Sequence, residues 1–315
     1  MRRVILFIAL SAFIAGTTAM LAGVAARQVP ATVSSSVSVR AIVERPDGTF
    51  VTGLTRDDFD VLVDGQPQVV ASVSEVDGPV SVLVLIDASA SMNLGDVASH
   101  LVLSRAMEQW LPFSLKPGDR ARIGNISRRG WLSERFTSDK QELVRFGFAA
   151  RTVAPADRMG PSPIWDAIDG AVSALEWEGG ARSILIVTDG RATGNRVSLK
   201  EAGAHAMASA VEVHVIAERD TPIAIQQLDG SLTHVLPGAG LRWLAEQTGG
   251  SYASDKRFPW SDPGPLFAQA IRRLHHAYTV GFIPSTPDGG VHAIEIKAKS
   301  PGLTVRARKQ FIANR

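Results

Sequence analysis

Apolar runs alternate with longer amphipathic segments over the central part of the chain. Short runs rich in β-branched residues predict strands at 81–86, 120–126, 130–136, 182–188, 211–217 and 250–254. The longer segments between them predict helices near 95–111, 139–148, 163–177, 198–210, 238–248 and 263–277. This alternation is typical of an α/β fold with a doubly wound, mostly parallel sheet flanked by helices.

Both ends of the chain show a different pattern, in which apolar and polar residues alternate over short segments. Before the central region these segments are separated by the turn-forming residues Pro46-Asp47-Gly48 and Asp64-Gly65. After Tyr278 the alternation returns in AYTVGFIP, VHAIEIKAKS and LTVRARKQF. The simplest architecture pairs the two sets of strands and inserts the α/β domain between them.

The first residues differ from the rest of the chain. Arg2 and Arg3 precede a nearly uncharged apolar stretch that ends in the small residues Val24, Ala25 and Ala26. This pattern indicates a secretory signal peptide or, if it is not cleaved, a membrane anchor. We therefore expect an exported protein that is periplasmic or secreted, or is anchored to the membrane by residues 4–26.

These patterns divide the chain into four parts. The parts are a signal peptide or anchor at 1–26, an N-terminal β unit at 27–79, an α/β domain at 80–278 and a C-terminal β segment at 279–315 that packs with 27–79.

The amino-acid composition indicates a globular protein and excludes several kinds of site and partner. The chain is 45% hydrophobic and 20% charged, as in ordinary globular proteins, and it contains no cysteine, so disulfides and thiolate metal sites are excluded. Basic and acidic residues number 33 and 31, and they balance once Arg2 and Arg3 are set aside. We therefore expect no nucleic-acid partner, and membrane contact only through an uncleaved N-terminal segment.

Candidate chemistry lies at the predicted strand ends. Asp87, Ser89 and Ser91 follow the first buried strand, Ser162 precedes a predicted helix, and Asp189 follows the strand ILIVT. In an open α/β sheet, ligands bind beyond the carboxyl ends of the strands, so these residues can share one site.

The ligand atoms in these clusters are all oxygens, which favours a hard divalent cation. Mg²⁺ is the first expectation, with Mn²⁺ or Ca²⁺ as substitutes. Alternate side chains of the Asp-x-Ser-x-Ser turn can point at one centre. Magnesium commonly keeps exchangeable water ligands, so a carboxylate from a partner can occupy one coordination position. Two structural roles are alternatives to metal binding. Ser89 or Ser91 can cap a following helix, and Thr188-Asp189-Gly190 can be a turn without a ligand.

These motifs resemble the von Willebrand factor type A (VWA) domain and its metal-ion-dependent adhesion site, or MIDAS. Asp87, Ser89 and Ser91 match the family's Asp-x-Ser-Gly-Ser element, with Ala90 in the glycine position. The step VTDG places Asp189 at the family's Thr-Asp-Gly element. At the middle element this chain has Ser162, bracketed by prolines, where the family has threonine. The resemblance implies a Rossmann-like fold and a metal held by these residues.

A second resemblance covers residues 37–312 and is to the VWA-related domain family described largely from Acidobacteria. It rests on VTGLTRDDFDVLVDGQPQVV, on LRWLAEQTGGSYAS, and on LHHAYTVGFIPS together with LTVRARKQF, in that order along the chain. Near the end of the chain Gln310 precedes Phe311, where the family has glycine. The resemblance implies an exported metal-binding domain.

Three functions follow as hypotheses. The first is an exported adhesion module whose bound cation engages an acidic group of a protein partner. The second is a metal-independent structural or assembly protein that associates through its β segments. The third is a hydrolase, but the chain has no nucleophile elbow, His-Glu-x-x-His pair or phosphate loop, so we expect no enzyme activity.

Overall fold

The computed structural model describes residues 36–76, 78–94, 97–98, 108–218, 222–226, 231–254, 264–285 and 288–313. The predicted signal peptide or anchor, residues 1–26, lies outside them. Within the described ranges no helix combines the length and the apolar character needed to cross a bilayer.

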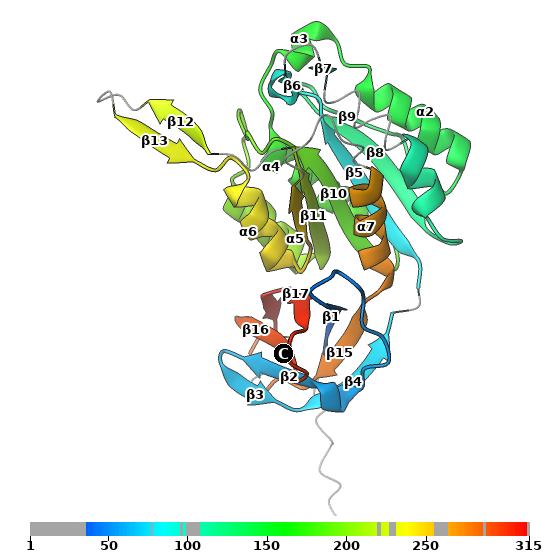
Figure 1. The fold of residues 1–315 in the computed structure, drawn as a ribbon, viewed down its shortest axis with the longest axis vertical. Coiled ribbons are helices and arrows are strands. Elements are labelled where there is room, and N and C mark those ends of the chain that lie inside the picture. Colours follow the sequence, from blue (N-terminus) through cyan, green and yellow to red (C-terminus); the bar gives the residue numbers. More distant parts are fainter. Residues whose placement is uncertain are drawn as a thin grey trace, which may run out of the picture. The chain divides into compact units, whose positions relative to one another are not determined.

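A six-stranded sheet forms the centre of the α/β domain, in the order β14-β11-β10-β5-β8-β9 (Figure 1). Neighbouring strands are parallel, except that the edge strand β9 runs antiparallel to β8. In chain order the strands are β5 (Val80–Asp87), β8 (Arg120–Ile126), β9 (Trp131–Leu132), β10 (Ala181–Thr188), β11 (Val211–Ala217) and β14 (Tyr252–Ser254).

Helices cover both faces of this sheet. Alternate residues of β5 point to opposite faces, so Val82 and Val84 belong to one core and Leu83 and Leu85 to the other. The first core includes residues of α2 and α7, and the second includes residues of α4, α5 and α6. The helices are α2 (Lys140–Arg151), α3 (Pro155–Arg158), α4 (Ile164–Leu175), α5 (Leu199–Ala208), α6 (Ala239–Thr248) and α7 (Gly264–His275).

Two predicted elements of this domain are wrong in extent. The strand expected at 130–136 is only β9, which pairs antiparallel because the connection from β8 is too short for a parallel crossover. The helix expected near 95–111 does not begin there, because β6 (Asn93–Leu94) pairs with β7 (Val97–Ala98). Helical structure is described only at 108–114.

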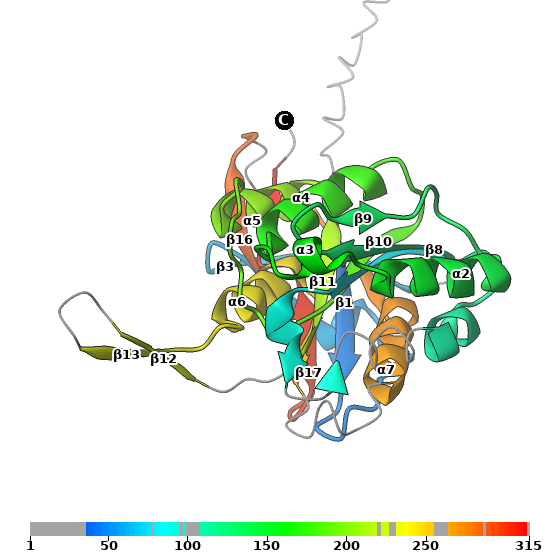
Figure 2. The same cartoon turned by 90° about the horizontal axis from the view of Figure 1, so that it is seen from above.

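The sequence patterns also missed a hairpin. Strands β12 (Ile223–Gln226) and β13 (Leu232–Val235) pair antiparallel and extend away from α6 in both views (Figures 1 and 2). Every residue of β13 is exposed. Because β13 is exposed, burial imposes on it no apolar alternation that could predict a strand.

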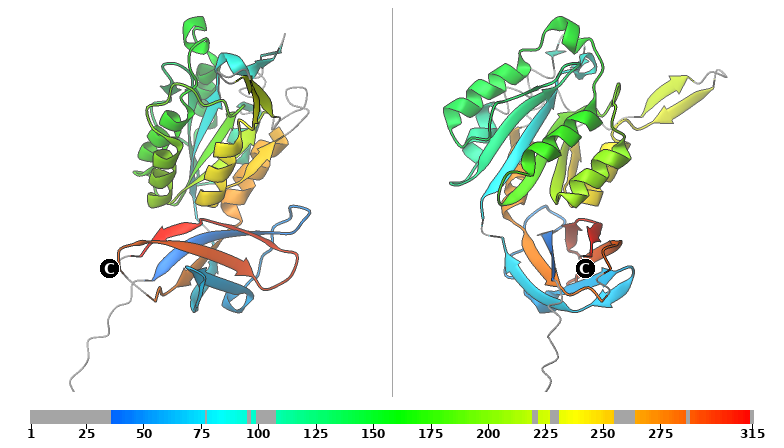
Figure 3. Two further views of the ribbon diagram at one scale, coloured as in Figure 1. Left: turned by 90° about the vertical axis from the view of Figure 1, so that its left-hand side faces the viewer. Right: turned by 180° about the vertical axis from the view of Figure 1, so that it is seen from behind.

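The strands at the two ends of the chain form two antiparallel sheets, β17-β1-β15-β4 and β18-β16-β2-β3 (Figure 3). N-terminal β1 pairs with C-terminal β15 and β17, and β2 pairs with β16. Their buried side chains form a third core. The strands are β1 (Val37–Glu44), β2 (Phe59–Val63), β3 (Gln66–Gln68), β4 (Val70–Glu75), β15 (Tyr278–Phe282), β16 (Val291–Ala298), β17 (Thr304–Ala307) and β18 (Gln310–Ile312).

A two-residue turn joins β2 to β3, as the dipeptide Asp64-Gly65 predicts. Asp64 and Gly65 have φ angles of 48° and 78°, and Val63 pairs with Gln66 across the turn. Both central residues of a type I′ turn need positive φ, which Asp and Gly tolerate best.

Ion pairs with buried carboxylates connect these strands with one another and with the α/β domain. The carboxylate of Glu44 on β1 lies 2.8 Å from Arg273 Nε on α7 and 3.1 Å from Arg306 Nε on β17. Arg40 on the same strand pairs with Glu212 on β11 at 2.8 Å. Charged groups therefore hold the inserted domain to its flanking strands.

A histidine between two carboxylates makes the stability of these sheets depend on pH. His292 Nδ1 lies 2.7 Å from Asp64 Oδ2, and Nε2 lies 3.0 Å from Asp288 Oδ1. The hydrogen bonds to Asp288 and then to Asp64 raise the pKa of His292 above its usual value. The stabilisation is therefore fully present below the unfolded pKa of about 6.5 and is lost as pH rises through the folded pKa.

We expect His292→Gln to lower the melting temperature more at about pH 6 than at about pH 9, because only the protonated imidazole attracts both carboxylates. Thermal melts of the two proteins across this pH range measure the difference. His234→Gln, in the exposed strand β13, serves as the control. A melting-temperature difference that is independent of pH would contradict this account.

Candidate metal centre

The site lies where two neighbouring parallel strands end. Val187 of β10 is in register with Ile86 of β5, which places Thr188 beside Asp87 at the carboxyl edge of the sheet. Both strands are buried runs of β-branched and aliphatic residues. The polar group that ends β5 therefore meets the polar group that ends β10.

Asp87 is the centre of the cluster. Its carboxylate is fully buried, and its Oδ2 accepts hydrogen bonds from Thr188 Oγ1 at 2.6 Å and from Ser162 Oγ at 3.1 Å. Its Oδ1 accepts from the backbone N–H of Ser89 at 3.0 Å. Burial raises the pKa of Asp87, and the negative charge of Asp189 raises it further, against the effect of the hydrogen bonds from Thr188 and Ser89.

Ser89 and Ser91 lie next to Asp87. Their Oγ atoms are 3.0 Å apart, and a 3₁₀ helix, η2 (Ala90–Met92), carries the turn. Met92 is fully buried and anchors this turn in the core. Within the described residues 88–94 the chain forms η2 and β6, so no α-helix begins there for either serine to cap.

The loop that carries Ser162 is fixed by a contact with the loop after β10. Ser162 N–H donates to Thr193 Oγ1 at 2.9 Å, and Thr193 N–H donates to the Ser162 carbonyl at 2.8 Å. Proline on both sides restricts the backbone of Ser162. Ser162 is buried, and its hydroxyl points at Asp87.

Asp189 belongs to the same edge of the sheet, although it makes no hydrogen bond to the other four predicted residues in the described structure. Its Oδ1 accepts from Arg191 N–H at 3.0 Å. Its Oδ2 is buried and accepts no hydrogen bond among the described residues, while Arg191 Nε lies 3.4 Å away as an ion pair. Arg191 is therefore the cationic neighbour of Oδ2 in the described structure, but it donates no hydrogen bond to this oxygen.

Gly190 lets this turn pass close to its neighbour. Its φ is 81°, and a Cβ atom there would lie 2.8 Å from the backbone of Gly238, just before α6. Only glycine combines this positive φ with such a close approach. The turn after β10 is therefore held between Ser162's loop and the start of α6.

Comparisons with known proteins address the fold. No protein-family model matches the sequence, and no curated protein matches it significantly. The resemblance to the Acidobacterial family over 37–312 therefore stays a prediction. Among solved structures, a von Willebrand factor type A protein from Catenulispora acidiphila matches 90% of this chain and 75% of its own, at 11% identity and a TM-score of 0.50.

The chain has a VWA-type fold. An aerotolerance-related membrane protein from Bacteroides fragilis is also similar, at 18% identity and a TM-score of 0.46, over 62% of this chain and 98% of its own. So is the proximal thread matrix protein 1 of the mussel byssus with a zinc-occupied MIDAS motif, at 14% identity and a TM-score of 0.47, over 67% and 49% of the two chains. These likenesses concern the fold.

Three residues that the sequence did not predict for the site hold its side chains and loops in place. Thr188 makes the shortest hydrogen bond to Asp87, and Thr193 fixes Ser162. Asp166 accepts from the backbone N–H groups of Arg196 and Val197, both at 2.8 Å, and so ties α4 to the loop after β10. The sequence motif VTDG includes Thr188 and could have placed it in the site. No motif or spacing in the sequence predicts the contact between Thr193 and Ser162.

The cluster suits a hard cation by its chemistry. It holds two carboxylates and three serine hydroxyls, all oxygen donors, around a buried edge of the sheet. The negative charge of Asp189 lies close enough to raise the pKa of Asp87, and the Oδ2 atom of Asp189 accepts no hydrogen bond from the described residues. A divalent cation would relieve both conditions, so the residues fit such an ion.

Proposed function

We propose that this chain is an exported VWA-type binding protein with a MIDAS-like site, related to the Acidobacterial family, that engages an acidic group of a protein partner through a divalent cation. In the proposal Asp87, Ser89 and Ser91 hold Mg²⁺, or Mn²⁺ or Ca²⁺ in its place. Asp189 orders the ligands through water, and Ser162 joins them. The convergence of three loops on the buried Asp87 carries the proposal.

The residues of the site have separate tasks. Asp87 and Asp189 supply negative charge, and Thr188 and Ser162 fix the orientation of the Asp87 carboxylate through hydrogen bonds. Ser89 and Ser91 present neighbouring hydroxyl oxygens. A bound Mg²⁺ supplies an exchangeable coordination position that a carboxylate can fill. No group in the cluster is assigned a nucleophilic or acid–base task, so the proposal is a binding function without catalysis.

A metal-independent assembly protein is the second candidate. The exposed strand β13 and the edges of the outer strands favour it. These edges pair with no further strand among the described residues, and a free strand edge can add a strand from another chain. In that case the cluster around Asp87 has a structural task only.

Affinity capture separates the two candidates. The immobilised chain is exposed to an envelope extract of the source organism with Mg²⁺, with EDTA, and with EDTA followed by excess Mg²⁺. We expect a protein partner to be captured, released by EDTA and recaptured when Mg²⁺ is restored. Capture of the same partner in EDTA would support assembly through β edges and reject the cation-dependent function.

Arg191 competes with a cation for Asp189. We expect Arg191→Gln to strengthen Mg²⁺ binding by up to about 5-fold, because an exposed ion pair contributes about 0.2–1 kcal/mol. Calorimetric titration measures the change. Arg196→Gln is the control, because Arg196 pairs with Asp166 instead and its side chain is 91% exposed. Unchanged or weaker binding in Arg191→Gln would show that this ion pair does not compete.

A further inference from the structure

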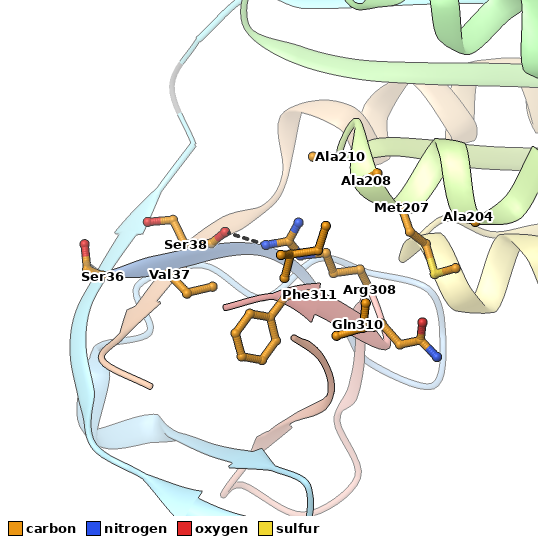
Figure 4. Close-up of a pocket in the computed structure, with 12 residues that line it drawn as sticks. Ser36, Val37, Ser38, Ala204, Met207, Ala208, Ala210, Arg308, Gln310 and Phe311 are labelled. Atoms are coloured by element: carbon orange, nitrogen blue, oxygen red, sulfur yellow. Dashed lines mark hydrogen bonds between the residues drawn. The ribbon is translucent and has the colours of Figure 1, made fainter. Parts of the chain in front are cut away.

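A cavity lies away from the cation cluster, between α5 and the strands from the two ends of the chain (Figure 4). Its volume is about 460 Å³, within the roughly 300–1,000 Å³ typical of sites for small molecules. One wall consists of Ala204, Met207 and Ala208 on α5, and the other includes Val37 on β1 and Ile312 on β18. The cavity is therefore lined mainly by small and apolar side chains.

One cation lines this cavity. Arg308 lies between β17 and β18, and its Nη2 donates to the carbonyl of Ser38 at 3.2 Å. Among the described residues it pairs with no carboxylate, and its Nε is buried without a hydrogen-bond partner. Arg306, two residues earlier, differs because it pairs with Glu44.

The environment of Arg308 is unfavourable for a charge without a partner. Burial lowers the pKa of Arg308, and no anion among the described residues offsets this effect. A guanidinium has five N–H donors, of which the structure accounts for one with the bond to Ser38. Guanidinium groups pair with carboxylates in a two-pronged geometry, so a carboxylate is the group that best completes this site.

The apolar surface around the cavity indicates the rest of the ligand. Val291 and Ile312 are 66% and 48% exposed where they line the cavity, and a bound hydrocarbon chain would cover them. Met207 faces them from α5, and its flexible thioether side chain adapts to irregular apolar shapes. The required ligand has one acidic head and an unbranched apolar body.

We propose that this cavity binds a small monocarboxylate with an apolar chain, such as a medium-chain fatty acid, with its carboxylate on Arg308 and its chain along α5. The site is independent of the cation cluster, because none of its lining residues belongs to that cluster. Two features select the ligand. The guanidinium of Arg308 selects for the negative charge of a carboxylate, and the apolar walls of the cavity select for a hydrocarbon chain.

Calorimetric titration of the full-length chain with decanoate in EDTA tests the proposal. We expect saturable binding to one site, with binding of butyrate and of decan-1-ol each at least about 10-fold weaker, because each lacks one of the two features. Arg308→Gln should weaken decanoate binding by about 10-fold or more. Arg120→Gln, whose side chain pairs with Glu178 elsewhere, should leave it unchanged.

A second variant separates loss of the site from loss of the fold. Ala208 is an exposed residue at the end of α5, so Ala208→Trp fills the cavity without disturbing the core. It should abolish decanoate binding while the melting temperature stays near that of the wild type. The proposal is overturned if decanoate does not bind, if Arg308→Gln binds it equally well, or if decan-1-ol binds as tightly.

Discussion

Replacing Asp87 by asparagine is expected to weaken Mg²⁺ and Mn²⁺ binding by at least about 100-fold. Loss of an outer partner of a metal site typically costs about 10–100-fold, and Asp87 is the buried carboxylate on which the other groups converge. Asparagine keeps the shape of the side chain and removes its charge. Calorimetric titration of the folded protein measures the loss.

The control for this variant is Asp169→Asn, which removes a carboxylate that pairs with His205 and does not belong to the cluster. It should bind the cation as the wild type does. Mg²⁺ should also raise the melting temperature of the wild type and of Asp169→Asn, and not that of Asp87→Asn, since a ligand stabilises only the state that binds it. Equal binding by Asp87→Asn would remove the basis of the proposed function.

Replacing Glu44 by alanine is expected to lower the free energy of unfolding by about 3–5 kcal/mol, the usual cost of breaking a buried ion pair from one side. Glu44 is 3% exposed and pairs with two arginines, of which Arg273 is itself buried. The variant leaves Arg273 without its counter-charge at the place where α7 meets β1. Urea denaturation monitored by circular dichroism measures the effect.

Glu178→Ala provides the matched comparison. Glu178 pairs with Arg120 at the same 2.8 Å, but the Arg120 side chain is 48% exposed, so we expect a loss of at most about 1 kcal/mol. A loss of similar size in both variants would show that burial does not set the strength of the Glu44 pairs.

The elements that the sequence predicts best are those whose surroundings impose a simple pattern. Strands β5, β10 and β11 are covered on both faces, so their segments are short and rich in β-branched and aliphatic residues. The observed bounds differ from the predicted ones by at most one residue. The α/β class with a largely parallel sheet is confirmed in this coarse form. The antiparallel edge strand β9 and the antiparallel sheets at the chain ends complete it.

Other features depend on contacts that no local pattern contains. Strand β13 is exposed, so burial imposes on it no alternation of apolar and polar residues that would predict a strand. The hydrogen bonds between Ser162 and Thr193 join residues from two loops. Neither loop has a sequence motif that predicts contact with the other. The step VTDG marks Thr188, but only the tertiary structure shows that its hydroxyl donates to the Asp87 carboxylate.

In the candidate site, too, local sequence patterns predict some features and tertiary contacts determine the others. The spacing of Asp87, Ser89 and Ser91 places three oxygen-bearing side chains in one turn, and the structure brings Ser162 to the Asp87 carboxylate. Asp189 is near enough to raise the pKa of Asp87, but its carboxylate accepts a hydrogen bond from the backbone N–H of Arg191. Sequence spacing therefore finds which residues share an edge, and the folded structure decides how they are oriented.

Anomalous diffraction from crystals grown with Mn²⁺ locates the bound cation directly. We expect one anomalous peak at the carboxyl edge of β5, in contact with the hydroxyl oxygens of Ser89 and Ser91 and next to the Asp87 carboxylate. The peak should be absent from crystals of Asp87→Asn grown in the same way. A wild-type structure without a peak at this edge, or with the ion bound only elsewhere, would contradict the account.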